Sequence, residues 1–430
     1  MSSAAADLVI AADRMVVGTG GAVLPSTAVA IGDGRIVEIG EAERMRQRVP
    51  PFVQWIDFPG CTLLPGLIDA HVHLTFSAGT FITRDLLADD DATMLLRGVA
   101  NARQALLAGV TTVRDLGGRG DLTLRLRDAI AREIVPGPRV LAAGRPLTIP
   151  DGHLHYLGGV VSGMDAIMAL TEALIGDGVD ALKIIATGGN ATPTSDPLEP
   201  AFTLAELRAI VAAGHRAGLP VTAHARGVKG IALLVESGID QIEHCRMEVG
   251  PGQWAFDEPL AQRLAANGIM AAPTLAASYR AMQRQAAGGE VGIRAGAIPI
   301  PVRQENARRL REAGVRIVVG TDAGATLARF DEAVHLELEL LVEAGWSPIE
   351  AIEAGTLGSA TAVRRERDLG SIEPGKIADL LVVRGDPTRD IRDIRAVEQV
   401  YLAGQPVVKD GYLAVDARPS PWPWPREEPR

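Results

Sequence analysis

The middle of this 430-residue chain alternates short apolar runs with longer segments of helical pattern, and this alternation constrains the fold more than any other feature. Short buried strands that are each followed by a crossover helix are typical of a parallel sheet. The runs, eight in number, are 62–73, 110–115, 139–143, 181–186, 221–224, 241–244, 269–274 and 316–322. Eight such units predict a closed (β/α)8 barrel. An open doubly wound sheet is the alternative, but it would carry a Gly-rich phosphate turn after its first strand, and none follows Leu74.

The two ends of the chain have a different texture, in which short β-like runs are separated by tight turns. These two ends can pair, so we expect a small composite β-sandwich domain made of residues 1–63 and 370–418. The barrel then occupies residues 64–369. Residues 419–430 form a Pro- and Trp-rich tail that we expect to be extended.

The last helical segment has its own start signal. Ser347 and Glu350 have the spacing of a capping box, and Pro348 stands at the first helical position. We therefore expect a helix to begin near Ser347.

Composition excludes several classes of protein. The chain carries 43 basic and 53 acidic residues, a net charge of −10, without a long basic run, which argues against binding of nucleic acid. The N-terminal residues lack a basic start, and no run reaches the roughly 18 apolar residues of a membrane span. The two cysteines, Cys61 and Cys245, cannot build a disulfide framework. We expect a cytoplasmic enzyme that interacts with neither nucleic acid nor membrane.

Histidines gather where the predicted strands end. His71 and His73 close the first run, and their two-residue spacing points both imidazoles into the mouth of the barrel. Further polar candidates lie in or at the end of later runs: Lys183, His224, His244 and Asp322. The carboxyl ends of barrel strands meet on one face, so these side chains converge. Four of the eight histidines in the chain stand at strand ends, which predicts a metal site better than scattered core histidines would.

Taken together, these segments resemble the metal-dependent amidohydrolase superfamily, in particular its dipeptidase-like and imidazolonepropionase-like branch. The resemblance spans nearly the whole chain. It is carried by LPGLIDAHVH at 64–73, GVTTVRD at 109–115, LKIIATGG at 182–189, VTAH at 221–224, IEH at 242–244, GTD at 320–322 and GSIEPGKIADL at 370–380.

This resemblance implies two zinc ions, or other divalent cations, per chain. The more buried ion would be held by His71, His73 and Asp322, and the second by His224 and His244. Lys183 would bridge both ions after carboxylation by CO2. A lysine ammonium cannot bind a metal, whereas a neutral amine in an apolar site can form an anionic carbamate. The alternatives for Lys183 are a barrel lysine whose ammonium extends to solvent and a partner in a structural ion pair.

The implied activity is hydrolysis of an amide-type C–N bond in a small molecule such as a dipeptide or an N-acyl amino acid. A zinc-bound hydroxide would attack, because two zinc ions lower the pKa of a bridging water towards about 7. Asp322 would carry the proton to the leaving nitrogen. A one-metal cyclic-amide hydrolase or deaminase is the alternative, although residues 226–239 contain no histidine of the kind that a deaminase uses. A non-catalytic barrel is a third reading.

Several residues are candidates for substrate contact. His153 and Tyr156 lie in the loop 144–159 after the third run. The resemblance implies that His153 contacts the substrate, where a histidine donor would assist at the scissile carbonyl. Arg226, two residues beyond His224, either clamps a substrate carboxylate or pairs with an acidic neighbour. Asn190 follows the fourth run and is expected near the ligand. Because such barrels often associate, we also expect a homo-oligomer.

Overall fold

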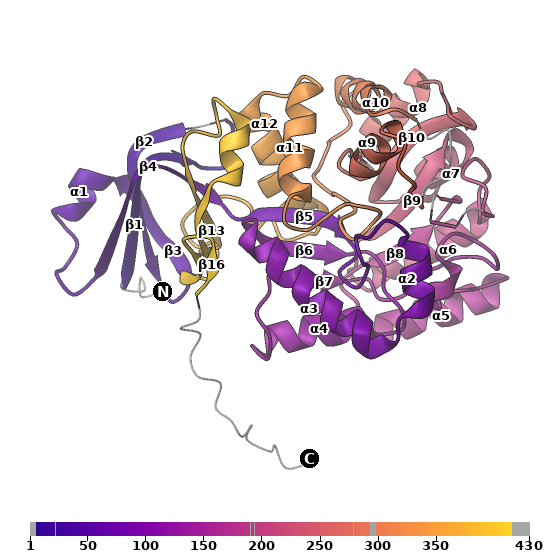
Figure 1. Ribbon diagram of the computed structural model, residues 1–430, viewed down its shortest axis with the longest axis horizontal. Coiled ribbons are helices and arrows are strands. Elements are labelled where there is room, and N and C mark those ends of the chain that lie inside the picture. The colour runs from indigo at the N-terminus through magenta and orange to yellow at the C-terminus, as the bar shows by residue number, and fades with distance from the viewer. Residues whose placement is uncertain are drawn as a thin grey trace, which may run out of the picture.

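The computed structural model describes residues 6–21, 23–189, 191–192, 194–277, 279–292 and 298–414. In Figure 1 the strands from the two ends of the chain, coloured indigo and yellow, lie together at one end of the molecule. Strands and helices from the middle of the chain make up the rest. The predicted Pro- and Trp-rich tail, 419–430, lies outside the described residues. Among the helices of the described ranges, none combines the length and the apolarity needed to cross a bilayer.

Parallel strands from the middle of the chain confirm a mixed α/β architecture. One sheet has the order β5 (Leu67–Val72), β6 (Val110–Asp115) and β7 (Arg139–Ala142). A second contains β8 (Leu182–Ile185), β9 (Val221–Gly227), β10 (Gln241–Gly250) and β12 (Met270–Ala272), with the short β11 (Gln253–Trp254) antiparallel to β10. Seven of the eight predicted runs therefore contain a parallel strand.

Single parallel bridges continue the pairing beyond these sheets. Leu147, which follows β7, pairs with Ile184 in β8. Ala271 in β12 pairs with Ile317, and Ala323 pairs with Val72 in β5. The eighth predicted run, 316–322, thus lies between β12 and β5, but it is not a regular strand.

The irregularity of this run has a steric cause. The backbone at Gly320 passes so close to β5 that a Cβ there would lie 2.8 Å from the Cβ of His71. Two residues later Asp322 adopts a left-handed conformation with φ 59°. Such a backbone interrupts a regular ladder but turns the carboxylate of Asp322 towards the histidines of β5.

Helices separate the parallel strands along the chain and surround them in Figure 1. The predicted capping box is confirmed, because the Ser347 side chain accepts from the Glu350 amide and α12 begins at Pro348. The α-helices are α1 (Ala42–Arg46), α2 (Ile82–Ala88), α3 (Asp91–Leu107), α4 (Leu122–Ala131), α5 (Met164–Gly176), α6 (Leu204–Arg216), α7 (Val228–Ser237), α8 (Glu258–Ala266), α9 (Tyr279–Ala286), α10 (Ile300–Glu312), α11 (Ala333–Glu343), α12 (Pro348–Glu353) and α13 (Ser359–Ala362). Shorter helical turns are η1 (His155–Leu157), the π-helical η2 (Ala354–Gly358) and η3 (Ile391–Arg395).

The two chain ends form one eight-stranded sheet. Its order is β16 (Tyr412–Leu413), β15 (Gln405–Lys409), β14 (Val397–Leu402), β13 (Leu380–Arg384), β4 (Gln54–Pro65), β1 (Leu8–Val16), β2 (Val23–Gly32) and β3 (Arg35–Glu41). We expected a sandwich of small antiparallel sheets. The strands pair in one continuous, mixed sheet, because the long β4 pairs parallel to β1 on one side and antiparallel to β13 on the other. Residues of both ends, including Ile10, Leu63 and Tyr401, share one apolar cluster.

The first predicted barrel run, 62–73, is divided between the two parts of the molecule. Residues up to Pro65 belong to β4, whereas β5 begins at Leu67. Gly66 separates the strands where a Cβ would lie 2.2 Å from the Oγ1 atom of Thr111, so only glycine fits this close approach.

Candidate active site

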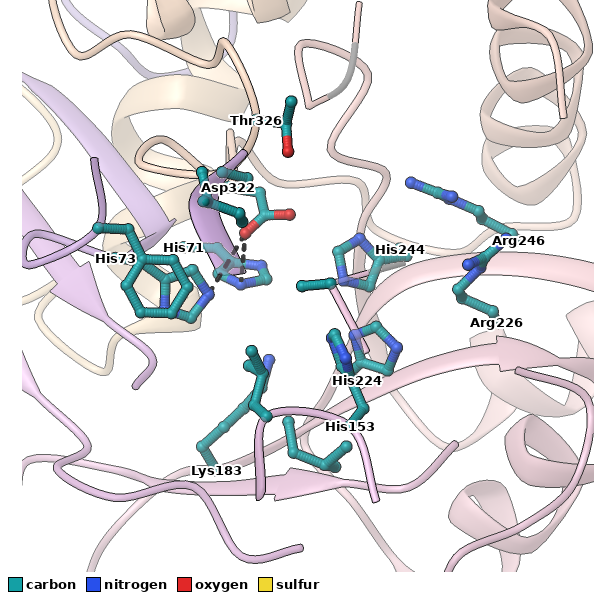
Figure 2. Close-up of a pocket in the computed structure, with 16 residues that line it drawn as sticks. His71, His73, His153, Lys183, His224, Arg226, His244, Arg246, Asp322 and Thr326 are labelled. Carbon is teal, nitrogen blue, oxygen red and sulfur yellow. Dashed lines mark ion pairs between the residues drawn. The ribbon is translucent and has the colours of Figure 1, made fainter. Parts of the chain in front are cut away.

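One pocket collects all six side chains that the sequence analysis proposed as metal ligands. They come from β5 and the residue that follows it, from β8, β9 and β10, and from the segment before Ala323, and Figure 2 shows them around a single cavity. The pocket is lined by His71, His73, Lys183, His224, His244 and Asp322, together with His153, Arg226, Arg246 and several smaller or apolar residues. Side chains that lie far apart in the sequence therefore face the same space.

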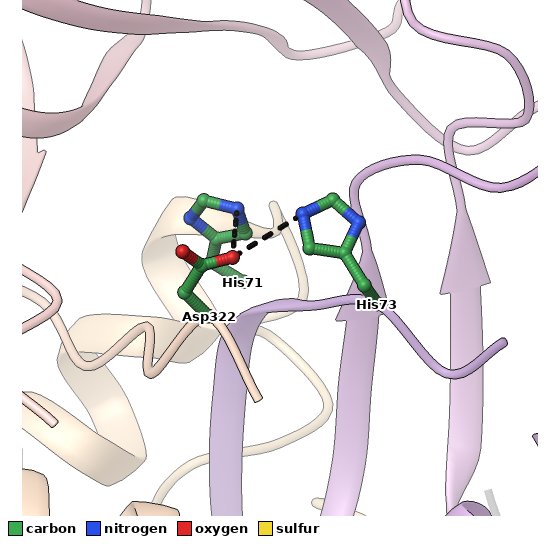
Figure 3. Close-up of side chains that lie close together, drawn as sticks. All are labelled: His71, His73 and Asp322. Carbon is green, nitrogen blue, oxygen red and sulfur yellow. Dashed lines mark ion pairs between the residues drawn. The ribbon is translucent and has the colours of Figure 1, made fainter. Parts of the chain in front are cut away.

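His71, His73 and Asp322 form the tightest group. The Oδ1 atom of Asp322 lies 3.6 Å from Nε2 of His71 and 3.3 Å from Nε2 of His73 (Figure 3). One ligand atom from each residue lies within 4.8 Å of the others. Two imidazole nitrogens and a carboxylate oxygen at such distances form a possible site for one divalent cation.

The Nδ1 atoms of both imidazoles, which lie on the side of the ring away from Asp322, each contact an oxygen atom of the protein. Nδ1 of His71 lies 2.9 Å from Oε2 of Glu243, and Nδ1 of His73 lies 2.8 Å from the carbonyl oxygen of Gly117. Burial, and then Lys183, lower the pKa of His71. Burial also acts to lower the pKa of His73, but the hydrogen bond with Asp322 outweighs it and raises that pKa. In both rings the protein holds Nδ1 and directs Nε2 to the cavity, as second-sphere partners of metal-binding histidines do.

His224 and His244 form a second group, with ring centroids 4.5 Å apart. Nε2 of His224 lies 3.0 Å from the carbonyl oxygen of Gly188, which leaves Nδ1 as the available nitrogen. Nδ1 of His244 lies 2.7 Å from Oγ1 of Thr274. Burial is the main cause that lowers the pKa of both imidazoles well below the ordinary value. Both rings are therefore neutral at pH 7, which is the form that binds metals.

Lys183 enters the same pocket from β8. Its side chain is 1% exposed, and Nζ has no hydrogen-bond partner among the described residues. Burial lowers the pKa of this amine to about 8, so that the neutral form is accessible near neutral pH. A buried amine without a partner is unfavourable unless another group satisfies it. The imidazoles and the carboxylate of this pocket are a donor set that fits a divalent cation.

The comparisons with known proteins agree with this geometry. Residues 62–407 match the model of the amidohydrolase family. The chain belongs to the amidohydrolase family. Ochratoxinase of Aspergillus niger is 25% identical over 380 residues, which cover 80% of this chain and 75% of that protein. Imidazolonepropionase of Symbiobacterium thermophilum is 26% identical over 393 residues, 84% of each chain.

A solved structure of a related hydrolase is similar to this chain in its fold as well as in its sequence. The chain superposes on an Xaa-Pro dipeptidase, crystallised with methionine in its active site, with a TM-score of 0.84 and 28% identity. The match covers 93% of this chain and 99% of the other. This amidohydrolase is therefore a hydrolase, as the sequence analysis expected.

The residues predicted to contact the substrate differ in whether they line the pocket. His153 lines the pocket with its ring centroid 4.7 Å from that of His224, and burial lowers its pKa to about 3. Tyr156 is half-buried outside the pocket lining, with its hydroxyl 3.4 Å from the carbonyl oxygen of Ala191. Asn190 lies outside the described residues.

Arg226 reaches the pocket but is already paired within the protein. Its Nε lies 2.8 Å from Oε1 of Glu248, and its Nη2 lies 2.9 Å from Oε2. The sequence left open whether Arg226 binds a substrate carboxylate or pairs with an acidic neighbour. The structure shows the pair with an acidic neighbour, Glu248.

Sequence reasoning missed Glu243 and Arg246. Glu243 is fully buried and contacts His71, although it precedes His244 directly. Strand alternation would send neighbouring side chains to opposite faces, but His244 has a left-handed backbone with φ 65°. Arg246 stands two residues beyond His244, just as Arg226 stands two residues beyond His224. That repeated spacing was the available signal for Arg246.

Proposed function

We propose that this amidohydrolase cleaves the amide-type C–N bond of a dipeptide or an N-acyl amino acid with the help of two divalent cations, zinc in the first instance. His71, His73 and Asp322 hold one cation, and His224 and His244 hold the other. Lys183 bridges the two as a carbamate. The observation that carries this proposal is the buried Nζ of Lys183, which lacks a partner in the described structure while five possible ligands surround it.

The proposal includes a closed (β/α)8 barrel as the scaffold of the site. The bridges at Leu147, Ile317 and Ala323 support it, because they link the parallel strands from β5 through β12 and back to β5. His71, His73 and Asp322 stand at the carboxyl ends of their parallel segments, whereas Lys183, His224 and His244 stand within β8, β9 and β10. All six side chains face one pocket, as expected for the catalytic face of a barrel.

When bound, two divalent cations supply a water that is acidic enough to ionise near pH 7 and a Lewis acid for the scissile carbonyl. The protein side chains provide the rest. Burial acts to raise the pKa of Asp322, but His73, His71 and Lys183 together hold it at about 2, so its carboxylate is ionised and accepts a proton only transiently. Asp322 can thus pass a proton to the leaving nitrogen. Neutral His153, at the opposite wall, can donate a hydrogen bond to the carbonyl oxygen.

The similarity to an Xaa-Pro dipeptidase supports a dipeptide as substrate. A cyclic-amide hydrolase is the second candidate, and the similarity to imidazolonepropionase favours it. Such an enzyme with one metal would not need Lys183. A panel of dipeptides, N-acyl amino acids and cyclic amides distinguishes the two, because hydrolysis of cyclic amides alone would support the second candidate.

The decisive experiment measures metal content and activity of Lys183→Ala beside the wild type. We expect about two zinc ions per wild-type chain, a loss of the bridged pair and of activity in the variant, and partial rescue by short carboxylic acids such as propionate. Lys229→Ala is the matched control, because Lys229 is an exposed lysine paired with Glu199. Carbamate formation is observed directly by NMR after exposure to 13C-labelled CO2. Full metal content and activity in Lys183→Ala would overturn the proposal.

A further inference from the structure

A cluster of buried arginines lies beside the proposed metal ligands. Arg226, Arg246 and Arg303 are 4%, 5% and 3% exposed. Arg226 projects from β9 and Arg246 from β10, and both line the pocket. Figure 2 shows the Arg246 side chain reaching towards the cavity on the side of His244 and Thr326. Guanidinium groups stay charged in proteins, so this wall of the pocket is cationic.

Among the described residues, ion pairs do not balance the charge of these three guanidinium groups. Glu248 is the carboxylate that pairs with it, and Arg226 occupies both oxygens of that carboxylate. Arg303 donates to the carbonyl oxygens of Ala277 and Ile298, each at 3.0 Å, which bring no charge. The carboxylate of Asp322 faces the cluster across the pocket, but it contacts His71 and His73.

Arg246 is the pocket-lining member of the cluster with unpartnered nitrogens. Nη2 of Arg303 also lacks a partner among the described residues, but Arg303 does not line the pocket. Its Nη1 lies 3.9 Å from Oε1 of Glu248, which is too far for a hydrogen bond. Neither Nε nor Nη1 has a hydrogen-bond partner in the described part of the chain. A buried charge without hydrogen bonds is costly, so a site that keeps one is arranged for a ligand of opposite charge.

We propose that Arg246 binds the carboxylate carried by the amine half of the substrate. The inference rests on the proposed function and narrows it to amides whose leaving amine bears a free carboxylate, as in dipeptides and N-acyl amino acids. A guanidinium presents a planar fork that matches a carboxylate with two parallel hydrogen bonds. Arg226 acts as a positioning residue, because its pairing with Glu248 keeps that carboxylate from Arg246.

The test uses glycine and the nineteen common L-amino acids, which are the possible leaving amines, and their α-carboxamides as probes. Binding to the metal-loaded wild type is measured by calorimetry. We expect at least one amino acid to bind about tenfold to a hundredfold more tightly than its carboxamide, the range for a charge-assisted pair in a buried site. Equal binding of acid and amide, or no binding of any acid in the set, would overturn the proposal.

Variants assign this preference to Arg246. Arg246→Gln should bind the acid as weakly as the amide and leave binding of the amide unchanged, while Arg246→Lys should keep part of the preference. Arg364→Gln is the matched control, since Arg364 is exposed and pairs with Asp240 away from the pocket lining. Thermal melting and metal content verify folding. If Arg246→Gln fails to fold, the wild-type comparison and Arg246→Lys still decide, and a full preference for the acid in Arg246→Lys would contradict a bidentate contact.

Failure of this inference is distinguishable from failure of the proposed function. An enzyme that holds two cations and hydrolyses N-acetyl amino acid amides as fast as the free acids keeps the proposed function and loses the role of Arg246. Preference for a carboxylate on the acyl half, tested with N-succinyl amides, would likewise overturn the role of Arg246 alone. A protein that binds no metal but still prefers amino acids to their amides through Arg246 would keep the role of Arg246 and lose the proposed function.

Discussion

His71 and Glu243 form a buried contact in which Nδ1 of the imidazole lies 2.9 Å from Oε2 of the carboxylate. The histidine is 1% exposed and the glutamate is fully buried. Burial acts to raise the pKa of Glu243, but His71, Lys183 and Arg114 outweigh it and hold that pKa at about 2. The carboxylate is therefore ionised and orients the ring of His71, so that Nε2 faces Asp322 and the cavity.

This contact predicts the behaviour of Glu243→Gln. An amide in this place orients His71 less firmly and withdraws its negative charge, so zinc affinity should fall by about tenfold to a hundredfold. Competition with a chromophoric chelator measures the change. Glu398→Gln, at an exposed pair with Arg384, serves as the control. Unchanged zinc affinity in Glu243→Gln would show that the contact does not tune the proposed ligand.

Arg114 predicts a stability effect beneath the site. Its side chain is 1% exposed and donates to the carbonyl oxygens of Ala70 and Ala362 and to the side chain of Gln241. Its Nη2 also lies 3.5 Å from Oε1 of Glu243. Arg114→Met removes these bonds and leaves the carboxylate less compensated, so the free energy of unfolding should fall by about 3 to 5 kcal/mol.

Denaturant unfolding of the metal-free protein measures this effect of Arg114→Met. The double variant Arg114→Met/Glu243→Gln should lose less stability than the two single changes added together, because it buries no unpaired charge. Strict additivity would contradict electrostatic coupling between the two residues.

Glu337 predicts a pH dependence of stability. It is fully buried on α11 and accepts from the amides of Leu275 at 3.0 Å and Ala276 at 2.6 Å. Burial raises its pKa from 4.5 to about 8. Between these values the folded protein keeps a proton that the unfolded chain has lost. The contribution of Glu337 to stability therefore decreases as pH rises from about 4.5 to about 8.

Glu337→Gln tests this dependence, because glutamine does not titrate. We expect the stability of the wild type relative to the variant to fall by at most about 1.4 kcal/mol per pH unit in that window. Denaturant unfolding from pH 5 to pH 9 measures the difference. Parallel pH profiles for the two proteins would refute the raised pKa.

His153 predicts a catalytic effect that is separate from metal binding. It lies in the pocket wall, and its Nδ1 is 3.3 Å from Oγ1 of Thr192. His153→Asn removes the proposed donor to the carbonyl oxygen, so kcat/KM should fall about a hundredfold or more while metal content stays unchanged. Loss of metal in this variant would instead identify His153 as a ligand.

The sequence by itself determined the features that depend on neighbours along the chain. Short apolar runs that alternate with helical segments located the strands, and β6 spans the predicted residues 110–115. The spacing of Ser347 and Glu350 located the start of α12. Positions within or at the end of predicted strands also identified the six candidate ligands that line the pocket, because the carboxyl ends of parallel strands meet on one face.

Only the tertiary structure decided which charged groups meet. The left-handed backbone at His244 turns Glu243 towards His71, which strand alternation does not predict. Glu248 pairs closely with Arg226 and not with Arg246, a choice that depends on distances between β9 and β10. These contacts between charged side chains depend on how the elements pack and on the backbone conformations that this packing imposes. Neither can be predicted from the local sequence.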